Sequence, residues 1–324
     1  MNIKYIIASV AVIVLIASAA FIYIYYQGQA PDEGLEALQN LVDDHGDKIS
    51  LTAYPERIVS LAPSATEILY AMDAGDKVVG VTEYCDYPYN FTAWIEKGNM
   101  TSVGGFRDIN VEVVASLNPD LILATGGVQQ DIVESLRDLG YKVIVLDPKN
   151  IDGVFRNIQL VGNATGKRDS ATALVNDMTS RIDAVANKVA DAASKPKVYY
   201  EVWFSEQSIW SVGAEGFENE LIAKAGGINI FENDSLEHFQ TDSEVILSKN
   251  PEIILLPVGM ETIGSELPFW KSFDDVKSRP AWDSISAVQN DQLYQIDGNA
   301  IERAGPRIAY MVETLAAIFH PELF

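Results

Sequence analysis

Hydrophobic residues along this chain alternate between short runs and segments with helical spacing. The segment VEVVASLNPDLILA (111–124) has helical spacing up to an Asn-Pro turn and then an apolar run typical of a strand. The segment QDIVESLRDLGYKVIVLD (130–147) repeats this order with a glycine at the turn. Strands that alternate with helices of this length predict parallel sheets with helical crossovers, so the expected fold class is α/β.

The middle of the chain, residues 152–195, has almost no strand signal. Its helical pattern is interrupted between Gly162 and Gly166 and resumes from Ala171 to Ala193, a rod of about 35 Å. Strand-like sequence returns directly afterwards. The pattern therefore predicts two α/β lobes, residues 42–151 and 196–324, joined by a long connecting helix.

The first 26 residues form an apolar segment that is long enough to cross a membrane. Tyr5 to Tyr26 holds no charge, and about 20 apolar residues span a hydrocarbon core of ~30 Å. Ala17-Ser18-Ala19 also fits a cleaved signal peptide, but the apolar run continues to Tyr26, which favours an uncleaved N-terminal transmembrane helix. Lys4 before the run and acidic residues after it favour a cytoplasmic N-terminus. We therefore expect a protein of the cell membrane, with residues 27–41 as an acidic tether and the remainder on the extracytoplasmic side.

One unit occurs once in each half of the chain. INVEVVASLNPDLILA (109–124) aligns without gaps on TDSEVILSKNPEIILL (241–256), with seven of the sixteen positions identical. Asn110 and Asp242 match as helix N-cap residues, and Glu112 and Glu244 are identical in the first turn. The helix dipole alone is a sufficient reason for each glutamate, because it stabilises a carboxylate at that position.

The stretch SLAPSATEILYAM (60–72) joins a strand-like run to a helical segment. Its serines lack the flanking glycines of a nucleophile elbow. Ser64 and Glu67 have the spacing of a capping box, so we expect Ser64 to cap the helix and Glu67 to bond back to the Ser64 amide.

No enzyme motif can be read in the rest of the chain. GNATGKRDS (162–170) has three residues between its glycines, where a phosphate-binding loop needs four, and no strand leads into it. No acid–base pair or catalytic triad is evident, so we predict that the protein is not an enzyme.

Composition excludes further classes of partner. The formal net charge of −23 repels nucleic acid and anionic membrane surfaces. The single cysteine, Cys85, allows no disulfide and is expected to be a small buried residue. His45, His238 and His320 are too scattered for a zinc motif, so no metal site and no cofactor are predicted.

Aromatic residues are frequent at the predicted strand ends and in the loops that follow. In open α/β sheets such loops contact ligands, and aromatic rings with few charges suit a large flat molecule. Since they occur in both halves, they favour a binding site between the lobes. The residues are Tyr84, Phe106, Trp203, Phe204, Trp210, Phe239 and Trp270.

Four segments resemble one known family. YPERIVSLAPSATEILYAMDAGDKVVGVTEYCDYP (54–88) is very similar to the opening of the vitamin B12 (cobalamin) periplasmic binding proteins, which belong to a helical-backbone group that also carries siderophores and haem. The similarity continues in VGGFRDINVEVVASLNPDLIL (103–123), NELIAKAGGINIF (219–231) and ERAGPRI (302–308). It covers residues 43–322.

The resemblance implies a fold, a function and a partner. Its members have two Rossmann-like lobes joined by one long helix, clasp a solute between them and deliver it to an ABC transporter permease. One surface glutamate per lobe docks onto arginines of the permease dimer, and the matching positions here are Glu112 and Glu244. The repeat identifies the same pair independently.

The resemblance also implies ligand-binding positions and a solute. By position, the ligand contacts are Tyr84, Phe106, Phe204, Trp210, His238, Phe239 and Asn299. Phe106 stands where members often have tryptophan and His238 where they have an aromatic residue, so haem or an iron–siderophore is the alternative to a corrinoid. An extracellular enzyme or a sensor domain on the same fold is the alternative from another class.

Overall fold

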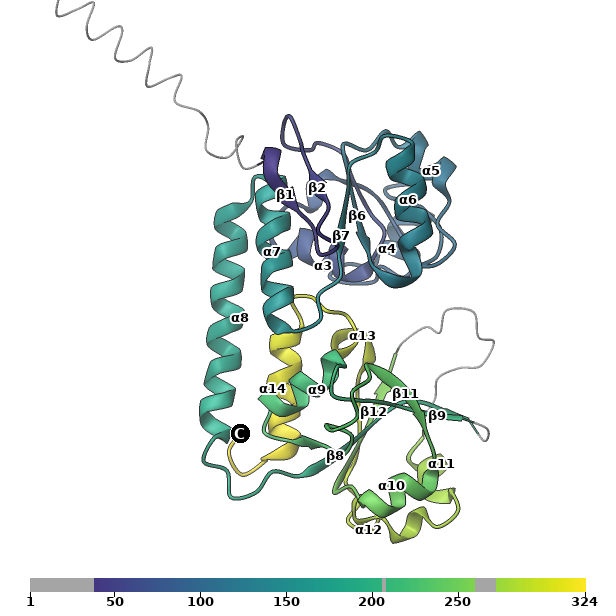
Figure 1. Ribbon diagram of the computed structural model, residues 1–324, viewed down its shortest axis with the longest axis vertical. Helices are drawn as coiled ribbons and strands as arrows, with labels where there is room; N and C mark the ends of the chain where they lie inside the picture. Colours follow the sequence, from purple (N-terminus) through teal and green to yellow (C-terminus); the bar gives the residue numbers. More distant parts are fainter. Residues whose placement is uncertain (1–37, 206–207, 260–271) are drawn as a thin grey trace, which may run out of the picture.

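The structure, a computed structural model, describes residues 38–205, 208–259 and 272–324, which form two α/β lobes beside a pair of helices (Figure 1). The predicted transmembrane segment, almost all of the acidic tether and Trp270 lie outside these residues. Within the described ranges, none of the helices has the length and apolar character needed to cross a bilayer.

The N-terminal lobe is built on five parallel strands in the order β5-β4-β3-β6-β7. The central strands are buried on both faces, which explains their continuous apolar sequence. The strands are β3 (Ile58–Ser60), β4 (Val78–Val81), β5 (Thr101–Ser102), β6 (Leu121–Thr125) and β7 (Val143–Leu146), with a separate hairpin of β1 (Leu41–Val42) and β2 (Lys48–Ile49). The helices are α3 (Pro63–Ala71), α4 (Phe91–Glu96), α5 (Val111–Ser116) and α6 (Gln130–Asp138).

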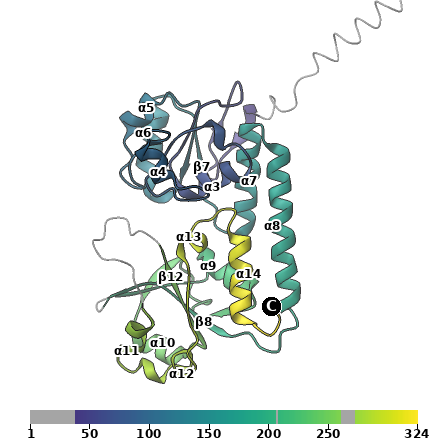
Figure 2. The same ribbon diagram turned by 180° about the vertical axis from the view of Figure 1, so that it is seen from behind.

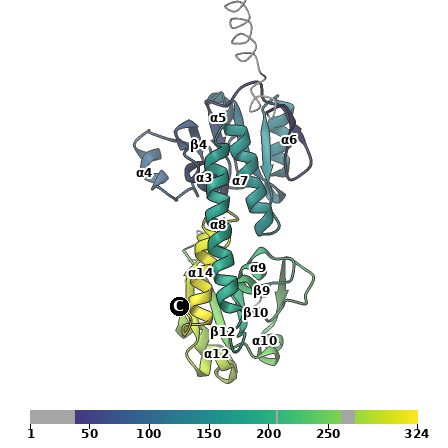
Figure 3. The ribbon, with the colours of Figure 1, turned by 90° about the vertical axis from the view of Figure 1, so that its left-hand side faces the viewer.

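Two helices, and not one, follow the N-terminal lobe. α7 (Ile151–Thr165) ends at Gly166, which adopts φ +73°, and α8 (Arg168–Val189) runs back beside it. The interruption predicted between Gly162 and Gly166 is shorter than expected, because Gly162 lies inside α7 and the chain reverses only at Gly166, where a glycine at positive φ ends a helix readily. α8 lies alongside both lobes (Figure 3).

The C-terminal lobe is built on a mixed sheet in the order β11-β9-β8-β12-β13, with β10 pairing β8. β10, β8, β12 and β13 are parallel, whereas β9 pairs antiparallel with both β8 and β11. The strands are β8 (Lys197–Ser205), β9 (Ser208–Val212), β10 (Ile228–Asn229), β11 (His238–Thr241), β12 (Ile253–Val258) and β13 (Leu293–Asp297). The helices are α9 (Phe217–Lys224), α10 (Ser243–Lys249), α11 (Phe273–Ser278), α12 (Ser286–Gln289), α13 (Gly298–Ile301) and α14 (Ile308–Phe319).

The last helix of the C-terminal lobe packs against α8. α14 lies beside α8 in Figure 2, and Arg181 of α8 donates to both carboxylate oxygens of Glu313 at 2.8 and 2.6 Å. The two α/β lobes with parallel strands confirm the predicted fold class. The chain passes from one lobe to the other through α7 and α8, and α14 of the C-terminal lobe packs against α8.

The capping box predicted for the first long helix is wrong. α3 begins one residue earlier, at Pro63, with Ala62 as an N-cap that has no side-chain hydrogen bond. A proline at the first helical position needs no partner for a backbone N–H, which removes one of the groups that a cap would satisfy. Glu67 is 2% exposed and pairs with arginines of the other lobe.

The single cysteine is buried, as predicted. Cys85 is 1% exposed, and its Sγ lies 3.1 Å from Thr66 Oγ1. Burial raises the pKa of the Cys85 thiol, although hydrogen bonds from Thr66 and Thr82 oppose the shift. Both burial and the raised pKa keep the thiolate population small.

Cys85 is therefore expected to report on unfolding. In the native protein it should react with iodoacetamide at least about 100-fold more slowly than in urea, because the reactive species is an exposed thiolate. Mass spectrometry of timed samples measures this ratio. Similar rates in both conditions would show that the Cys85 loop opens in the native protein.

Candidate functional site

The repeated sequence forms the same helix start in both lobes. At the start of α5, Asn110 Oδ1 accepts a hydrogen bond from the Val113 amide at 3.1 Å. At the start of α10, Asp242 Oδ1 accepts one from the Val245 amide at 2.9 Å. These bonds confirm the two predicted N-caps.

The two helices also end alike. Asn118 after α5 has φ +45° and Asn250 after α10 has φ +46°, the left-handed conformation that asparagine tolerates better than most residues. A proline follows each, and the chain then enters β6 or β12. Each unit thus leads into an inner strand of its sheet, and the structure confirms the internal repeat.

Each of these helices presents one exposed glutamate. Glu112 and Glu244 occupy the first turns of α5 and α10. Figure 1 shows both helices on the side of their lobes away from α8. The molecule therefore has two equivalent carboxylates, one on each lobe.

The C-terminal lobe has an aromatic sheet face. Trp203 on β8 pairs with Trp210 on β9, and the next pair is Phe204 with Ile209. Paired residues share a face and successive residues alternate, so the two tryptophans lie opposite Phe204 and Ile209. His238 on β11 pairs with Val212, two residues from Trp210, and shares the face of the tryptophans. We call this surface, made of Trp203, Trp210 and His238, the tryptophan face.

Two predicted ligand residues lie on the other side of this sheet. The Phe204 ring stacks under the Arg279 guanidinium at 3.4 Å, and the Phe239 ring meets Phe231 edge-on at 5.1 Å. Both pack on the core covered by α10, α11 and α12. Figure 1 shows these helices on the side of the sheet farther from the N-terminal lobe, so the tryptophan face is turned toward that lobe.

A buried glutamine organises the corresponding edge of the N-terminal sheet. Gln129 Nε2 donates to the carbonyls of Leu61 at 2.7 Å and Phe106 at 2.9 Å, and its Oε1 accepts from the Thr125 amide at 3.0 Å. Leu61 follows β3, Phe106 follows β5 and Thr125 ends β6. The three residues therefore mark the carboxyl edge of the sheet, where open α/β folds bind ligands. The predicted ligand residue Phe106 lies at this edge and is half-buried.

A buried ion-pair network joins the lobes. Glu67 of α3 accepts hydrogen bonds from Arg307 Nε at 2.9 Å and Nη2 at 2.7 Å, and from Arg303 Nη1 at 3.3 Å. Both arginines come from the C-terminal lobe, between α13 and α14. We call Glu67, Arg303 and Arg307 the interlobe network. The two arginines compensate the charge of the Glu67 carboxylate, because a buried charge needs an opposite charge close to it.

Two predicted ligand residues lie beside the interlobe network. Arg303 Nη2 donates to the Tyr84 carbonyl at 3.1 Å and to Asn299 Oδ1 at 3.0 Å. Asn299 Nδ2 donates in turn to Asp86 at 3.0 Å and to the Gly259 carbonyl at 2.9 Å. The structure thus brings Tyr84 and Asn299 together at the junction of the lobes.

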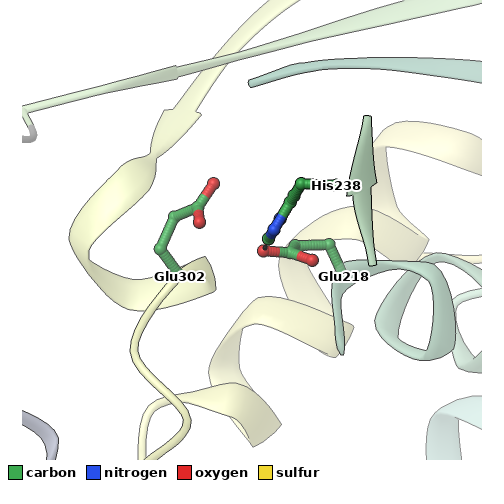
Figure 4. Close-up of side chains that lie close together, drawn as sticks. All are labelled: Glu218, His238 and Glu302. Atoms are coloured by element: carbon green, nitrogen blue, oxygen red, sulfur yellow. Dashed lines mark hydrogen bonds and ion pairs between the residues drawn. The ribbon is translucent and has the colours of Figure 1, made fainter. Parts of the chain in front are cut away.

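A second polar cluster lies in the C-terminal lobe, where Glu218, His238 and Glu302 converge (Figure 4). One oxygen or nitrogen of each residue lies within 4.8 Å of the others, so these side chains could serve as metal ligands. His238 Nε2 is 3.4 Å from Glu218 Oε1, and the Tyr200 hydroxyl donates to Glu302. We call these three residues the Glu–His–Glu cluster.

The three groups shift one another's pKa values. Burial would lower the pKa of His238, but the hydrogen bond and charge of Glu218 raise it to about 9. Burial would raise the pKa of Glu218, yet His238 outweighs it and the pKa is lowered. Burial and the charge of Glu218 raise the pKa of Glu302 to about 8. At neutral pH the cluster therefore combines an imidazolium, a carboxylate and a protonated Glu302.

Sequence reasoning missed most of these polar contacts. Arg303 and Arg307 lie between α13 and α14, and their partner Glu67 is more than 230 residues away in the chain. Glu218 and Glu302 have no spacing that relates them to His238. The sequence therefore contained no local signal for either cluster.

Two α/β lobes joined by helices, with a polar network at their junction, are the architecture of two-lobed binding proteins. The sequence matches the periplasmic binding protein family over residues 58–300. The chain belongs to this family.

Three similar proteins add detail. The ABC transporter substrate-binding lipoprotein YvrC of Bacillus subtilis, itself uncharacterized, is 32% identical over 87% of this chain and 86% of its own. The vitamin B12-binding protein of Vibrio cholerae is 30% identical over 82% of this chain and 90% of its own. A solved structure from Staphylococcus epidermidis, described as a possible iron-binding (periplasmic solute-binding) protein, is 29% identical, covers 82% of this chain and 99% of its own, and has a TM-score of 0.69.

Proposed function

We propose that this protein captures a corrinoid between its two lobes, outside the cytoplasm, and delivers it to the permease of an ABC importer. The observation that supports this most strongly is the similarity to vitamin B12-binding relatives, which extends over most of both chains. The fold is consistent with this proposal. The tryptophan face of the C-terminal lobe is turned toward the N-terminal lobe, whose sheet carries Phe106 at its carboxyl edge.

The proposed ligand surface has two sides and a floor. Trp203, Trp210 and His238 form one side, and Phe106 at the carboxyl edge of the N-terminal sheet forms the other. Rings of this size cover the flat apolar parts of a macrocycle while leaving its polar rim to solvent. Tyr84 and Asn299 lie at the floor, next to the interlobe network. Phe204 and Phe239 are left out, because they pack on the opposite face of their sheet.

Haem or an iron–siderophore is the second candidate solute. Two observations favour it: the imidazole of His238 lies on the tryptophan face, and a structural relative is described as a possible iron-binding protein. An imidazole is a common ligand of iron, whereas a corrinoid needs no ligand from the protein to be held by its apolar surface.

Docking on the permease is assigned to Glu112 and Glu244. The structure supports this assignment with two exposed carboxylates on equivalent helices, one from each lobe. A two-lobed protein can thereby meet the two subunits of a permease dimer with the same chemical group on each side. Arginines are suitable partners, because they bind carboxylates in a bidentate manner.

Attachment to the membrane is proposed for residues 1–26. The apolar run from Tyr5 to Tyr26 has the length of a transmembrane helix and ends in aromatic residues that suit the membrane interface. The relative YvrC is named a lipoprotein, whereas the one cysteine of this chain is buried in the N-terminal lobe. The apolar run would therefore replace a lipid as the anchor.

Replacing Trp210 by alanine tests the ligand surface. We expect solute affinity to fall by about 10- to 100-fold, because a buried aromatic contact contributes roughly 1–3 kcal/mol. The matched control is Tyr310→Ala, which removes an exposed ring from α14. Isothermal titration with the best solute measures both variants. Equal affinity of the Trp210 variant and the wild type would place the solute elsewhere.

A competition experiment tests which solute is bound. The purified full chain in detergent is incubated with equal amounts of cyanocobalamin, haemin and ferrichrome, and the molecules that remain after gel filtration are identified by mass spectrometry. We expect cyanocobalamin to dominate. Retention of haemin or ferrichrome alone would support the second candidate, and retention of none would contradict both.

A further inference from the structure

The Glu–His–Glu cluster is assembled from three separate segments of the C-terminal lobe. Glu218 belongs to α9, His238 begins β11 and Glu302 directly follows α13. Figure 4 shows the three side chains pointing toward one another from these elements. Because each residue comes from a different element, the three are brought together by the tertiary structure and not by their spacing in the sequence.

One distance in the cluster matches that between two ligand atoms of a tetrahedral metal ion, and the third donor atom lies nearby. With metal–ligand bonds of about 2.0–2.1 Å, two ligand atoms of a tetrahedral zinc ion lie about 3.3 Å apart. His238 Nε2 and Glu218 Oε1 are 3.4 Å apart, and all three donor atoms lie within 4.8 Å. The Tyr200 hydroxyl hydrogen-bonds to Glu302, the kind of outer contact that orients a ligating carboxylate.

One oxygen of the cluster lacks a partner. Glu218 is 3% exposed, and its Oε2 has no hydrogen-bond partner among the described residues. A buried carboxylate oxygen without a partner is costly, because a charged group that has left water needs a compensating interaction. Without a metal ion, the protonated His238 compensates the charge on Glu218, and a bound Zn²⁺ would take the place of that proton.

We propose that Glu218, His238 and Glu302 bind a divalent transition-metal ion, with Zn²⁺ the best match. One imidazole nitrogen and two carboxylate oxygens are a ligand set that suits zinc, and two carboxylates balance the ion's charge. Three protein ligands leave a fourth position for water or another ligand. Mg²⁺ and Ca²⁺ bind less well, because they prefer six or more oxygen ligands.

This ion site goes beyond the proposed solute function. All three ligands belong to one lobe, so the ion needs neither the N-terminal lobe nor a solute. His238 also belongs to the tryptophan face, which places the ion at the border of the proposed ligand surface. The metal and the solute can therefore be measured separately.

Isothermal titration of the metal-free full chain in detergent with ZnCl₂ tests the proposal. We expect one Zn²⁺ per chain, with weak or no binding of MgCl₂. Glu218→Gln, Glu302→Gln and His238→Ala should each weaken Zn²⁺ binding by more than about 100-fold, because loss of even an outer contact costs about 10- to 100-fold. A Co²⁺ titration with visible spectra reports tetrahedral coordination independently.

Control variants separate this site from adventitious surface binding. His45 lies 3.5 Å from Asp147 on the N-terminal lobe, so His45→Ala removes a comparable imidazole that also faces a carboxylate and should leave Zn²⁺ affinity unchanged. Circular dichroism shows whether each variant is folded, and the isosteric Glu302→Gln keeps the test valid if His238→Ala unfolds. No zinc binding to the wild type, or equal binding by folded Glu218→Gln and Glu302→Gln variants, would overturn the proposal. The cyanocobalamin titration is independent of this result.

Discussion

Replacing Glu112 and Glu244 together by alanine should abolish delivery of the solute while leaving its binding unchanged. Each carboxylate paired with an arginine contributes roughly 1.5–3 kcal/mol, so loss of both should weaken permease docking by more than about 100-fold. Solute affinity should not change, because both residues lie exposed in the first turns of α5 and α10. Uptake of labelled cyanocobalamin by permease-containing vesicles measures delivery, and titration measures binding.

The control for this double variant has the same change in net charge. Asp183 and Asp191 are exposed, on α8 and just after it, and Figure 1 shows α8 on the side of the molecule opposite α5 and α10. Their double alanine variant should support normal uptake. If the Glu112 and Glu244 variant loses solute affinity instead, the two glutamates belong to the ligand site and the docking assignment is wrong.

Glu67→Gln should destabilise the protein strongly. The substitution removes the negative charge between Arg303 and Arg307, which are only 13% and 12% exposed at their side chains. Breaking a buried pair by removing one partner costs about 3–5 kcal/mol, and the remaining pairs of these arginines with Asp86 and Asp297 favour the lower value, about 3 kcal/mol. Urea unfolding, followed by fluorescence, measures the change in free energy of unfolding.

A surface ion pair provides the comparison for Glu67. Glu56 pairs with Lys77 but is 71% exposed at its side chain, so Glu56→Gln should change stability by less than about 1 kcal/mol. Equal effects of the two substitutions would show that the interlobe network does not stabilise the fold. A large effect of Glu67→Gln would explain why a polar residue lies on the buried side of α3.

Local patterns were sufficient to predict the lobes and the repeated helices. Asn110 and Asp242 cap helices that the sequence already marks, since a cap depends only on its own side chain and the next three residues. Helical and strand periodicity likewise located the two sheets. Of the two glycines predicted to interrupt the helix, Gly166 ends α7 whereas Gly162 lies inside it, and the reversal of the chain after Gly166 could not be predicted from the sequence.

Contacts between distant segments could not be predicted in this way. Trp203 and Phe204 look alike in sequence, yet they point to opposite faces, and an irregularity in the pairing of β8 with β9 shifts the alternation just before them. Glu67 has capping-box spacing, but its partners come from the other lobe. Glu218 and Glu302 meet His238 only because three elements of the C-terminal lobe converge.

Equilibrium titration of the purified full chain with cyanocobalamin tests the proposed function most directly. We expect one cyanocobalamin per chain and a Kd below ~10 μM, which corresponds to about −7 kcal/mol. Trp203 and Trp210 of the tryptophan face provide an intrinsic fluorescence signal for the same titration. Saturable 1:1 binding that weakens in the Trp210→Ala variant would support a corrinoid-binding protein. A Kd above ~10 μM, with or without tighter binding of haemin or ferrichrome, would contradict it.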